Sequence, residues 1–148
     1  MKKIPISMDN ENGVQKEVYF PIVLGIIFDT KTKKILIGKR KDDEIEDLIW
    51  CFPGGRPKIG DELEEGLKRE IKQVTGLDAE SLGVIFAKTY PEKRDLLAIY
   101  FLCEITGGEE KFGGDFHELK WVEPNEIEKY FTTSYHPKLK EYIEGLKS

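Results

Sequence analysis

Short apolar runs alternate with polar turns in the first third of the chain. The run from Tyr19 to Phe28 is rich in β-branched and aromatic residues and predicts a strand. The polar segment from Asp29 to Lys34 predicts a turn into a second strand around Ile35 to Gly38. A further apolar run, Leu48 to Phe52, predicts a strand that stops at a sharp turn over residues 53–55. This region is therefore expected to supply several strands of one sheet.

The middle of the chain changes to a helical pattern. Between Asp61 and Thr75 apolar residues recur every three or four positions, which predicts an amphipathic helix packed against one face of a sheet. Gly76 follows and is expected to end the helix in a left-handed conformation. The residues expected to be buried on this face are Leu63, Leu67, Ile71 and Val74.

The second half returns to strands and ends in helices. Strands are expected over Ser81 to Thr89, Leu96 to Ile105 and Leu119 to Val122, and helices over Asn125 to Tyr130 and Pro137 to Leu146. Strands before, between and after helices, without strict alternation, predict an α+β layered domain with a central mixed sheet. We expect one domain over residues 1–148, with residues 1–17 as a candidate peripheral arm.

Composition narrows the class of protein. The 148 residues are 39% hydrophobic, which is enough for one core, and no run approaches the roughly 20 apolar residues of a membrane-spanning helix. Residues 1–15 are polar and have no apolar signal core. Cys51 and Cys103 stand far apart between apolar neighbours, which favours buried thiols over a disulfide or a zinc site. A soluble, cytoplasmic protein without a membrane partner is expected.

The charge argues against one large class of partner. The net charge is -5, and no sustained basic stripe could neutralise the phosphates of a nucleic-acid polymer. A small anionic ligand held by a few local cations fits better. Lys39, Arg40 and Arg56 are the candidate cations, and each could equally be a solvated surface residue.

One segment carries a specific chemical pattern. A glycine loop at Gly54 and Gly55 leads into the predicted helix. The helix contains the pair Arg69 and Glu70 and is followed by Gly76. Here the chain resembles the Nudix hydrolase family, whose box reads Gly, five residues, Glu, seven residues, Arg-Glu, aliphatic, any, Glu-Glu, any, Gly, aliphatic. The positions that match are Gly55, Arg69, Glu70, Ile71, Gly76 and Leu77; Asp61 replaces the first Glu, and Gln73 and Val74 replace the Glu-Glu pair.

The resemblance reaches beyond the box. The segments Gly38-Lys39-Arg40, residues 50–55 and residues 118–122 are also similar to that family, so the likeness covers roughly residues 19 to 145. It implies an α/β/α sandwich and Mg²⁺-dependent (or Mn²⁺-dependent) hydrolysis of a small nucleotide substrate. Because dimers are common among similar proteins, the resemblance leaves a homodimer open.

The box has a physical rationale. Magnesium prefers hard oxygen ligands, and carboxylates at helix positions i, i+3 and i+4 share a face. Of these positions, Glu70 alone keeps a carboxylate here. The resemblance implies that Glu70, the Gly54 carbonyl, Glu118 and Asp61 hold the metal and that Arg69 orients the glutamate. It also implies catalytic roles for Glu70, Arg69 and Glu118, and substrate contacts for Lys39, Arg40, Gly55 and Arg56.

Several of these residues have a simpler interpretation. Asp61 with Glu64 also fits a helix cap, and the two glycines also fit a plain turn. Glu118 is preferred to His117 as a ligand or general base because a lone histidine is more often structural. His136 precedes Pro137 and is expected to cap or pack the last helix.

Three functions remain open from the sequence. The first is hydrolysis of a nucleoside diphosphate linked to another group, with an ADP-ribose-like or nucleotide-sugar substrate. The second is cleavage at the sugar carbon, as in the GDP-mannose mannosyl hydrolase branch, whose box is also degenerate. The third is an inactive Nudix domain that binds a nucleotide, which the absence of charge at Gln73 and Val74 favours.

Overall fold

The computed structural model describes residues 17–41, 49–90, 93–131 and 135–147, so nearly all of the predicted peripheral arm lies outside the described residues. β1 (Phe20–Asp29) and β2 (Lys34–Arg40) form an antiparallel pair joined by the predicted turn. In that turn the backbone N–H of Lys31 donates to the carboxylate of Asp29.

One twisted, mixed sheet forms the centre of the molecule. Its strands run in the order β3 (Trp50–Cys51), β2, β1, β6 (Lys93–Gly108) and β5 (Leu77–Tyr90), while β4 (Gly54–Gly55) pairs with β1 and β7 (Phe116–Val122) pairs with β2. β1 and β6 are parallel, and the other pairs are antiparallel. The predicted mixed sheet is confirmed.

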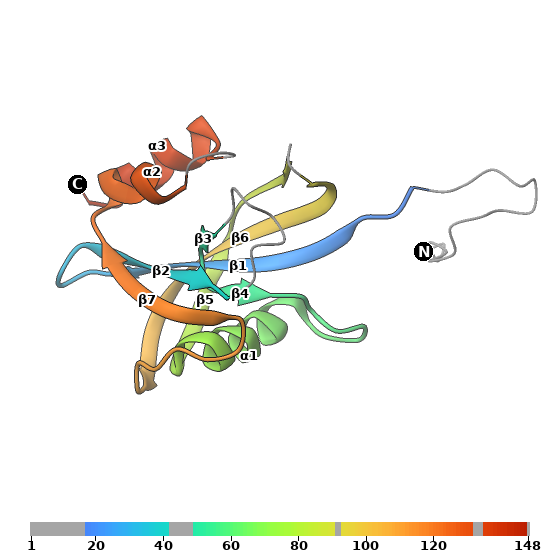
Figure 1. The fold of residues 1–148 in the computed structure, drawn as a ribbon, viewed down its shortest axis with the longest axis horizontal. Helices are drawn as coiled ribbons and strands as arrows, with labels where there is room; N and C mark the ends of the chain where they lie inside the picture. Colours follow the sequence, from blue (N-terminus) through green and yellow to red (C-terminus); the bar gives the residue numbers. More distant parts are fainter. Residues whose placement is uncertain (1–16, 42–48, 91–92, 132–134, 148) are drawn as a thin grey trace, which may run out of the picture.

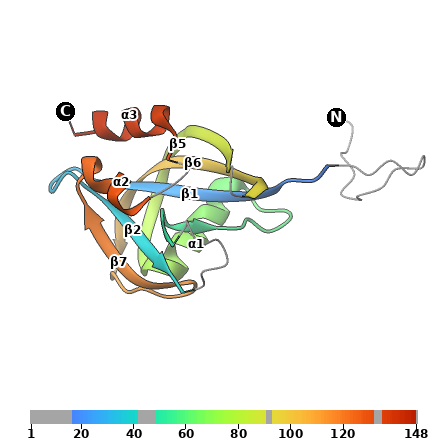
Figure 2. The same ribbon diagram turned by 45° about the horizontal axis from the view of Figure 1, so that its top comes forward.

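Helices cover both faces of this sheet (Figures 1 and 2). α1 (Leu63–Thr75) lies on one face, and α2 (Ile127–Tyr130) and α3 (Pro137–Gly145) lie on the other. The segment predicted as a helix over Asn125 to Tyr130 is a 3₁₀ turn, η2 (Pro124–Glu126), that continues into α2. The α/β/α sandwich is confirmed. No helix in the described part of the chain is long and apolar enough to span a bilayer.

Alternation along the strands builds a core on each side of the sheet. In β1, Val23 and Ile27 pack in the cluster that contains Leu67 and Ile71 of α1, whereas Leu24 and Ile26 pack in the cluster that contains α3. Gly25 faces α1, where a Cβ would lie 2.9 Å from Cδ1 of Ile71. The residues that alternate along β1 therefore pack directly against the residues that recur every 3.6 positions along α1, and together they form the buried interface between the sheet and the helix.

The α1 prediction is right in its centre and wrong at its start. Leu67, Ile71 and Val74 are buried as expected, and Gly76 ends the helix with φ of 75°. Leu63 was expected in the core but is 40% exposed. The helix begins at Leu63, and its N-cap is Glu62 without a side-chain hydrogen bond, so the alternative of an Asp61 cap is wrong.

Three further expectations need correction. Gly54 and Gly55 form the short strand β4 rather than a plain turn, because their backbone pairs with β1. Cys51 is half-buried rather than buried, although both cysteines are free and Cys103 is buried as predicted. β5 and β6 extend beyond the predicted ranges because they pair with each other from Leu77 opposite Gly108 to Tyr90 opposite Lys93.

Candidate active site

The short strand β4, which consists of Gly54 and Gly55, lies against the side chain of Glu70. Gly55 pairs with Val23 and Gly54 with Leu24 of β1, and the Gly25 N–H donates to the Pro53 carbonyl at 2.8 Å. A Cβ placed on Gly55 would overlap Oε1 of Glu70. A side chain at position 55 would displace the Glu70 carboxylate, so glycine lets this carboxylate lie against β4. The box residues Gly55 and Glu70 are thus brought into contact.

Arg69 joins the two carboxylates of the box. Its Nη2 lies 2.8 Å from Oδ2 of Asp61, and its Nε lies 3.3 Å from Oε2 of Glu70. The Nη2 atom is buried and has no well-aligned hydrogen bond among the described residues, so its contact with Asp61 is an ion pair. The arginine thus tethers the loop before α1 to the catalytic candidate on α1.

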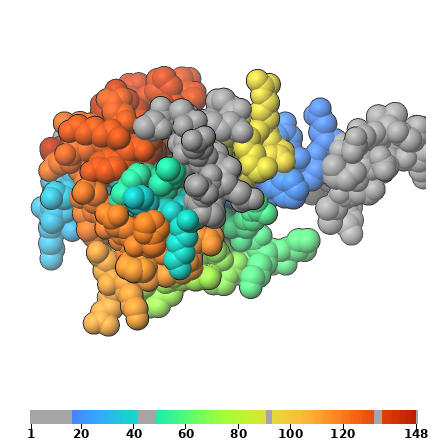
Figure 3. Space-filling view, viewed as in Figure 1, coloured from blue at the N-terminus to red at the C-terminus, as the bar shows by residue number. Residues whose placement is uncertain are grey.

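Asp61 also closes the loop that precedes α1. Its Oδ2 accepts the Lys58 N–H at 2.8 Å, and its own N–H donates to the Lys58 carbonyl at 2.9 Å. This loop projects from the surface as the green lobe in Figure 3, and its Ile59 is 94% exposed. Asp61 is therefore a loop-closing residue tied to Arg69, which explains why it does not cap the helix.

The Asp61 interactions predict a pH dependence. The Arg69 guanidinium and then the Lys58 N–H hold the pKa of Asp61 below its usual 3.8. A lowered folded-state pKa stabilises the protein above the unfolded pKa, and this contribution is lost as the pH falls through the folded value. We expect Asp61→Asn to lower the urea midpoint at pH 7 but hardly to change it well below pH 3.8. Equal midpoint shifts at both pH values would contradict this role.

The three basic residues predicted to bind phosphate lie on two different segments of the chain. Lys39 and Arg40 end β2, where a bulge interrupts the pairing with β7. Arg56 follows β4 and is exposed, with its guanidinium 5.7 Å from the centroid of the Phe20 ring. Phe20 was not predicted as part of this region, and an exposed aromatic residue at the start of a strand gives no sequence signal for such a contact.

Glu118 lies on β7 directly opposite Lys39 of β2, with its side chain exposed. His117, its neighbour, is exposed as well. No three His, Cys, Asp or Glu side chains within residues 17–41, 49–90, 93–131 and 135–147 are grouped so as to hold a metal ion. The structure thus joins Asp61, Arg69, Glu70 and Gly55, but it does not add Glu118 to their contacts.

Gln73 and Val74 meet the loop between β6 and β7. The N–H groups of Lys111 and Gly113 donate to the carbonyls of Thr75 and Val74, so this loop caps the carboxyl end of α1. Val74 is 5% exposed, as predicted. Gln73 is exposed and borders an open hollow together with Lys111 and Phe112. Its side chain also lies beside Gly114, where a Cβ would lie 3.5 Å from the amide nitrogen of Gln73. The sequence pattern did not predict these main-chain hydrogen bonds between the loop and the end of α1.

His136 has the structural role expected of it. Its Nδ1 accepts the Lys138 N–H at 3.1 Å as the N-cap of α3, and its ring lies 4.9 Å from that of Phe86. It therefore belongs to the aromatic packing between α3 and the sheet.

Comparison with known proteins identifies the family of the chain. The NUDIX domain model matches residues 18–143. Over 102 residues the chain is 33% identical to an ADP-ribose pyrophosphatase of Methanocaldococcus jannaschii, a match that covers 67% of this chain but only 60% of that protein. Over 121 residues it is 30% identical to a putative 8-oxo-dGTP diphosphatase of Bacillus subtilis, covering 81% of this chain and 78% of that protein.

A solved structure shows the same fold. The MutT protein of Methanosarcina mazei superimposes with a TM-score of 0.68 at 19% identity, covering 88% of this chain and 94% of that one. The family match spans the sheet, α1 and most of α3, and it includes every residue of the Asp61, Arg69 and Glu70 cluster. The chain therefore belongs to the Nudix hydrolase family.

Proposed function

We propose that this chain hydrolyses the pyrophosphate bond of a nucleoside diphosphate linked to another group, with an ADP-ribose-like or nucleotide-sugar substrate. The observation that carries the proposal is the contact of Glu70 with Gly55, reinforced by the Arg69 ion pairs. An ADP-ribose pyrophosphatase among the similar proteins supports this substrate class.

The donor atoms present fit a divalent cation only in part. Glu70 and Asp61 offer carboxylates on either side of Arg69, and the Gly54 carbonyl is a further candidate. Mg²⁺ is commonly held by one or two carboxylates, with substrate phosphates and water completing its shell. We therefore propose Mg²⁺ or Mn²⁺ binding that depends on the substrate, with Glu70 as the principal protein ligand. When bound, the cation would offset the diphosphate charge and make a water molecule a better nucleophile.

The remaining residues have roles that follow from their positions. Arg69 orients the Glu70 carboxylate through its 3.3 Å contact, and Asp61 fixes Arg69 from the loop before α1. Lys39, Arg40 and Arg56 supply positive charge toward the diphosphate, while Glu118 on β7 is the candidate that orients or deprotonates the attacking water.

A substrate screen tests this proposal. ADP-ribose, GDP-mannose, dinucleoside polyphosphates and nucleoside triphosphates are each incubated with Mg²⁺ or Mn²⁺, and all nucleotide products are separated and quantified. We expect the fastest turnover with ADP-ribose or a nucleotide sugar. Preferred turnover of nucleoside triphosphates would refute the proposed substrate class.

Binding without turnover is the second candidate function. It is favoured by Val74, which is buried and apolar at a position where the family box has a glutamate. An inactive domain would bind a nucleotide with an affinity that added Mg²⁺ leaves unchanged. Substrate-dependent metal affinity together with turnover would exclude it.

Replacing Gln73 with Glu tests the reduced charge of the site. The carboxylate at position 73 would lie one helical turn from Glu70 on the same face, so we expect several-fold tighter Mg²⁺ binding, measured by calorimetry with a non-hydrolysable substrate analogue. Asn125→Asp makes the same chemical change at an exposed position of η2 and serves as the control. Unchanged or weaker metal affinity in Gln73→Glu would count against this placement.

A further inference from the structure

The open hollow at the carboxyl end of α1 is large enough for a small organic ligand. One wall is the end of α1, with Lys72 and Gln73, and the other wall is residues 108–112, where β6 ends and the following loop begins. The hollow has a volume of about 780 Å³, which lies within the range of sites that hold such ligands. The loop residues in its wall have no part in the proposed reaction, so the hollow calls for a separate explanation.

Main-chain contacts hold the loop wall of the hollow in place. The N–H groups of Glu109 and Lys111 donate to carbonyls at the end of α1, at 3.2 Å and 2.8 Å. A Cβ on Gly76 would overlap the carbonyl oxygen of Glu109, so glycine is needed for the loop to approach the helix this closely. Trp121 of β7 adds a side-chain contact, because its indole N–H donates to the Glu110 carboxylate at 2.7 Å. The shape of the hollow is therefore fixed by the fold before any ligand binds.

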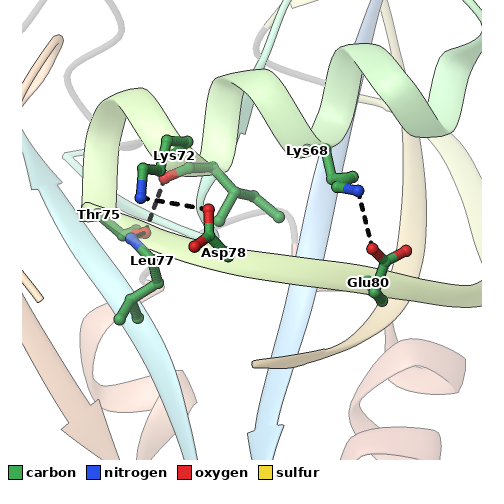
Figure 4. Close-up of polar contacts among 7 residues, drawn as sticks. Lys68, Lys72, Thr75, Leu77, Asp78 and Glu80 are labelled. Atoms are coloured by element: carbon green, nitrogen blue, oxygen red, sulfur yellow. Dashed lines mark hydrogen bonds and ion pairs between the residues drawn. The ribbon is translucent and has the colours of Figure 1, made fainter. Parts of the chain in front are cut away.

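The polar groups in the hollow carry little net charge. Lys72 forms an ion pair with Asp78 of β5 at 3.2 Å (Figure 4). In the described part of the chain, the side chains of Gln73, Glu109 and Lys111 form no hydrogen bond or ion pair. Glu109 and Lys111 have opposite charges, so these three side chains offer a ligand hydrogen bonds but no excess of positive charge. The end of α1 is also the negative end of the helix dipole, which disfavours a phosphate and favours a hydrogen-bond donor.

Phe112 gives the hollow a flat apolar surface. Its side chain is 51% exposed, and its ring contacts no other aromatic ring among residues 17–41, 49–90, 93–131 and 135–147. An exposed ring of this kind can stack on any nucleobase. The carboxylate of Glu109 and the amide of Gln73 accept hydrogen bonds, which matches the exocyclic amino group of adenine, guanine or cytosine. The chemistry of the hollow thus fits the base of a nucleotide and not its phosphates.

Gln73 connects the hollow with the candidate active site. It follows Glu70 by three residues, so it lies about 4.5 Å farther along the helix axis and about 60° around it. In a nucleotide the ribose separates the base from the diphosphate. A substrate with its diphosphate beside Glu70 would therefore pass its ribose over Gln73 and reach the ring of Phe112 with its base.

We propose that this hollow binds an amino-bearing nucleobase of the substrate, with Phe112 stacked on the base and with Gln73 and Glu109 bonded to its polar edge. The inference rests on the proposed function for the identity of the ligand as a nucleotide. It does not depend on the metal or on which bond of the substrate is cleaved.

Calorimetric titration with AMP, GMP, CMP and UMP, without divalent metal, tests the site in the absence of turnover. We expect at least one of the first three to bind more tightly than UMP. Phe112→Leu keeps an apolar side chain but removes the ring, so it should weaken binding at least about fivefold, whereas Phe112→Tyr should bind as the wild type does. Tyr142→Leu, which removes an exposed aromatic ring from α3 on the other face of the sheet, is the control and should have no effect. Absence of binding by all four nucleotides, or equal affinity in Phe112→Leu, would overturn the proposal.

The indole N–H of Trp121 reports where the nucleotide binds. Because this group is bonded to Glu110 in the wall of the hollow, its NMR signal should shift when the base binds. Ribose 5-phosphate, which has no base, should leave the signal unchanged, and Trp121→Phe assigns it. An equal shift with ribose 5-phosphate, or no shift with a nucleotide that binds, would overturn the placement of the base in the hollow.

Steady-state kinetics with the preferred substrate separates this inference from the proposed function. Phe112→Leu should raise KM at least about fivefold and leave kcat within about twofold of the wild type, because the base contact is the same in the ground state and the transition state. Hydrolysis with an unchanged KM in Phe112→Leu would overturn the base site and leave the proposed hydrolysis standing. Nucleotide binding that depends on Phe112, without hydrolysis of any substrate, would support the base site and refute the proposed function.

Discussion

Replacing Glu70 with Gln is expected to reduce turnover by at least about a hundredfold, because this carboxylate supplies negative charge at the metal mainly in the transition state. Glu70 is also the one carboxylate that remains at the three box positions on α1. Its side chain is 18% exposed and contacts Arg69, which is itself 36% exposed. The loss of that contact should therefore cost about 1 kcal/mol of unfolding free energy or less.

The matched control for this change is Glu65→Gln, which removes the same charge from an exposed position on α1. The steady-state rate and the melting temperature are measured for both variants. A folded Glu70→Gln protein with normal activity would show that the metal is held elsewhere. A large loss of stability with little specific loss of activity would instead assign Glu70 a structural role.

The neighbouring glycines of β4 are expected to respond differently to alanine. In Gly55→Ala the new Cβ overlaps Oε1 of Glu70, the far end of a flexible side chain that can move. Stability should change little, but displacement of this carboxylate should lower turnover by at least about tenfold. Activity at the wild-type level in Gly55→Ala would contradict the proposed placement of Glu70.

In Gly54→Ala the new Cβ overlaps the backbone carbonyl oxygen of Val23 and would lie 2.9 Å from the Cα of Leu24. These atoms belong to the central strand β1 and cannot move independently, so we expect a loss of about 1–3 kcal/mol in unfolding free energy. Urea unfolding of the two variants separates the effects. If Gly54→Ala and Gly55→Ala lowered the unfolding free energy equally, the proposed difference between a backbone clash at residue 54 and a side-chain clash at residue 55 would be wrong.

The sequence predicted the features that depend on local periodicity. The spacing of Leu67, Ile71 and Val74 identified the buried face of α1, and Gly76 identified its end. The same spacing failed at Leu63, because periodicity indicates the direction in which a side chain points but not how far the opposing sheet extends. The mixed sheet also followed from the order of strands and helices.

The features that sequence could not predict depend on contacts between distant segments. The pairing of Gly54 and Gly55 with β1 is a backbone contact that any short glycine segment could make or lack. The cap on α1 by the loop between β6 and β7 uses main-chain N–H groups, which leave no pattern in the side chains. The family box placed Arg69 beside Glu70, but only the structure shows that Arg69 also reaches Asp61.

Identification of the nucleotide released from ADP-ribose and from GDP-mannose tests the central claim most directly. The wild-type and Glu70→Gln proteins are incubated with each substrate, with Mg²⁺ or with a chelator, and the products are separated chromatographically. Hydrolysis of the pyrophosphate bond at the Glu70 site predicts a nucleoside monophosphate and a sugar phosphate, formed by the wild type with Mg²⁺ and strongly reduced in the variant. A nucleoside diphosphate with free sugar, or nucleotide binding without any product, would contradict the proposed function.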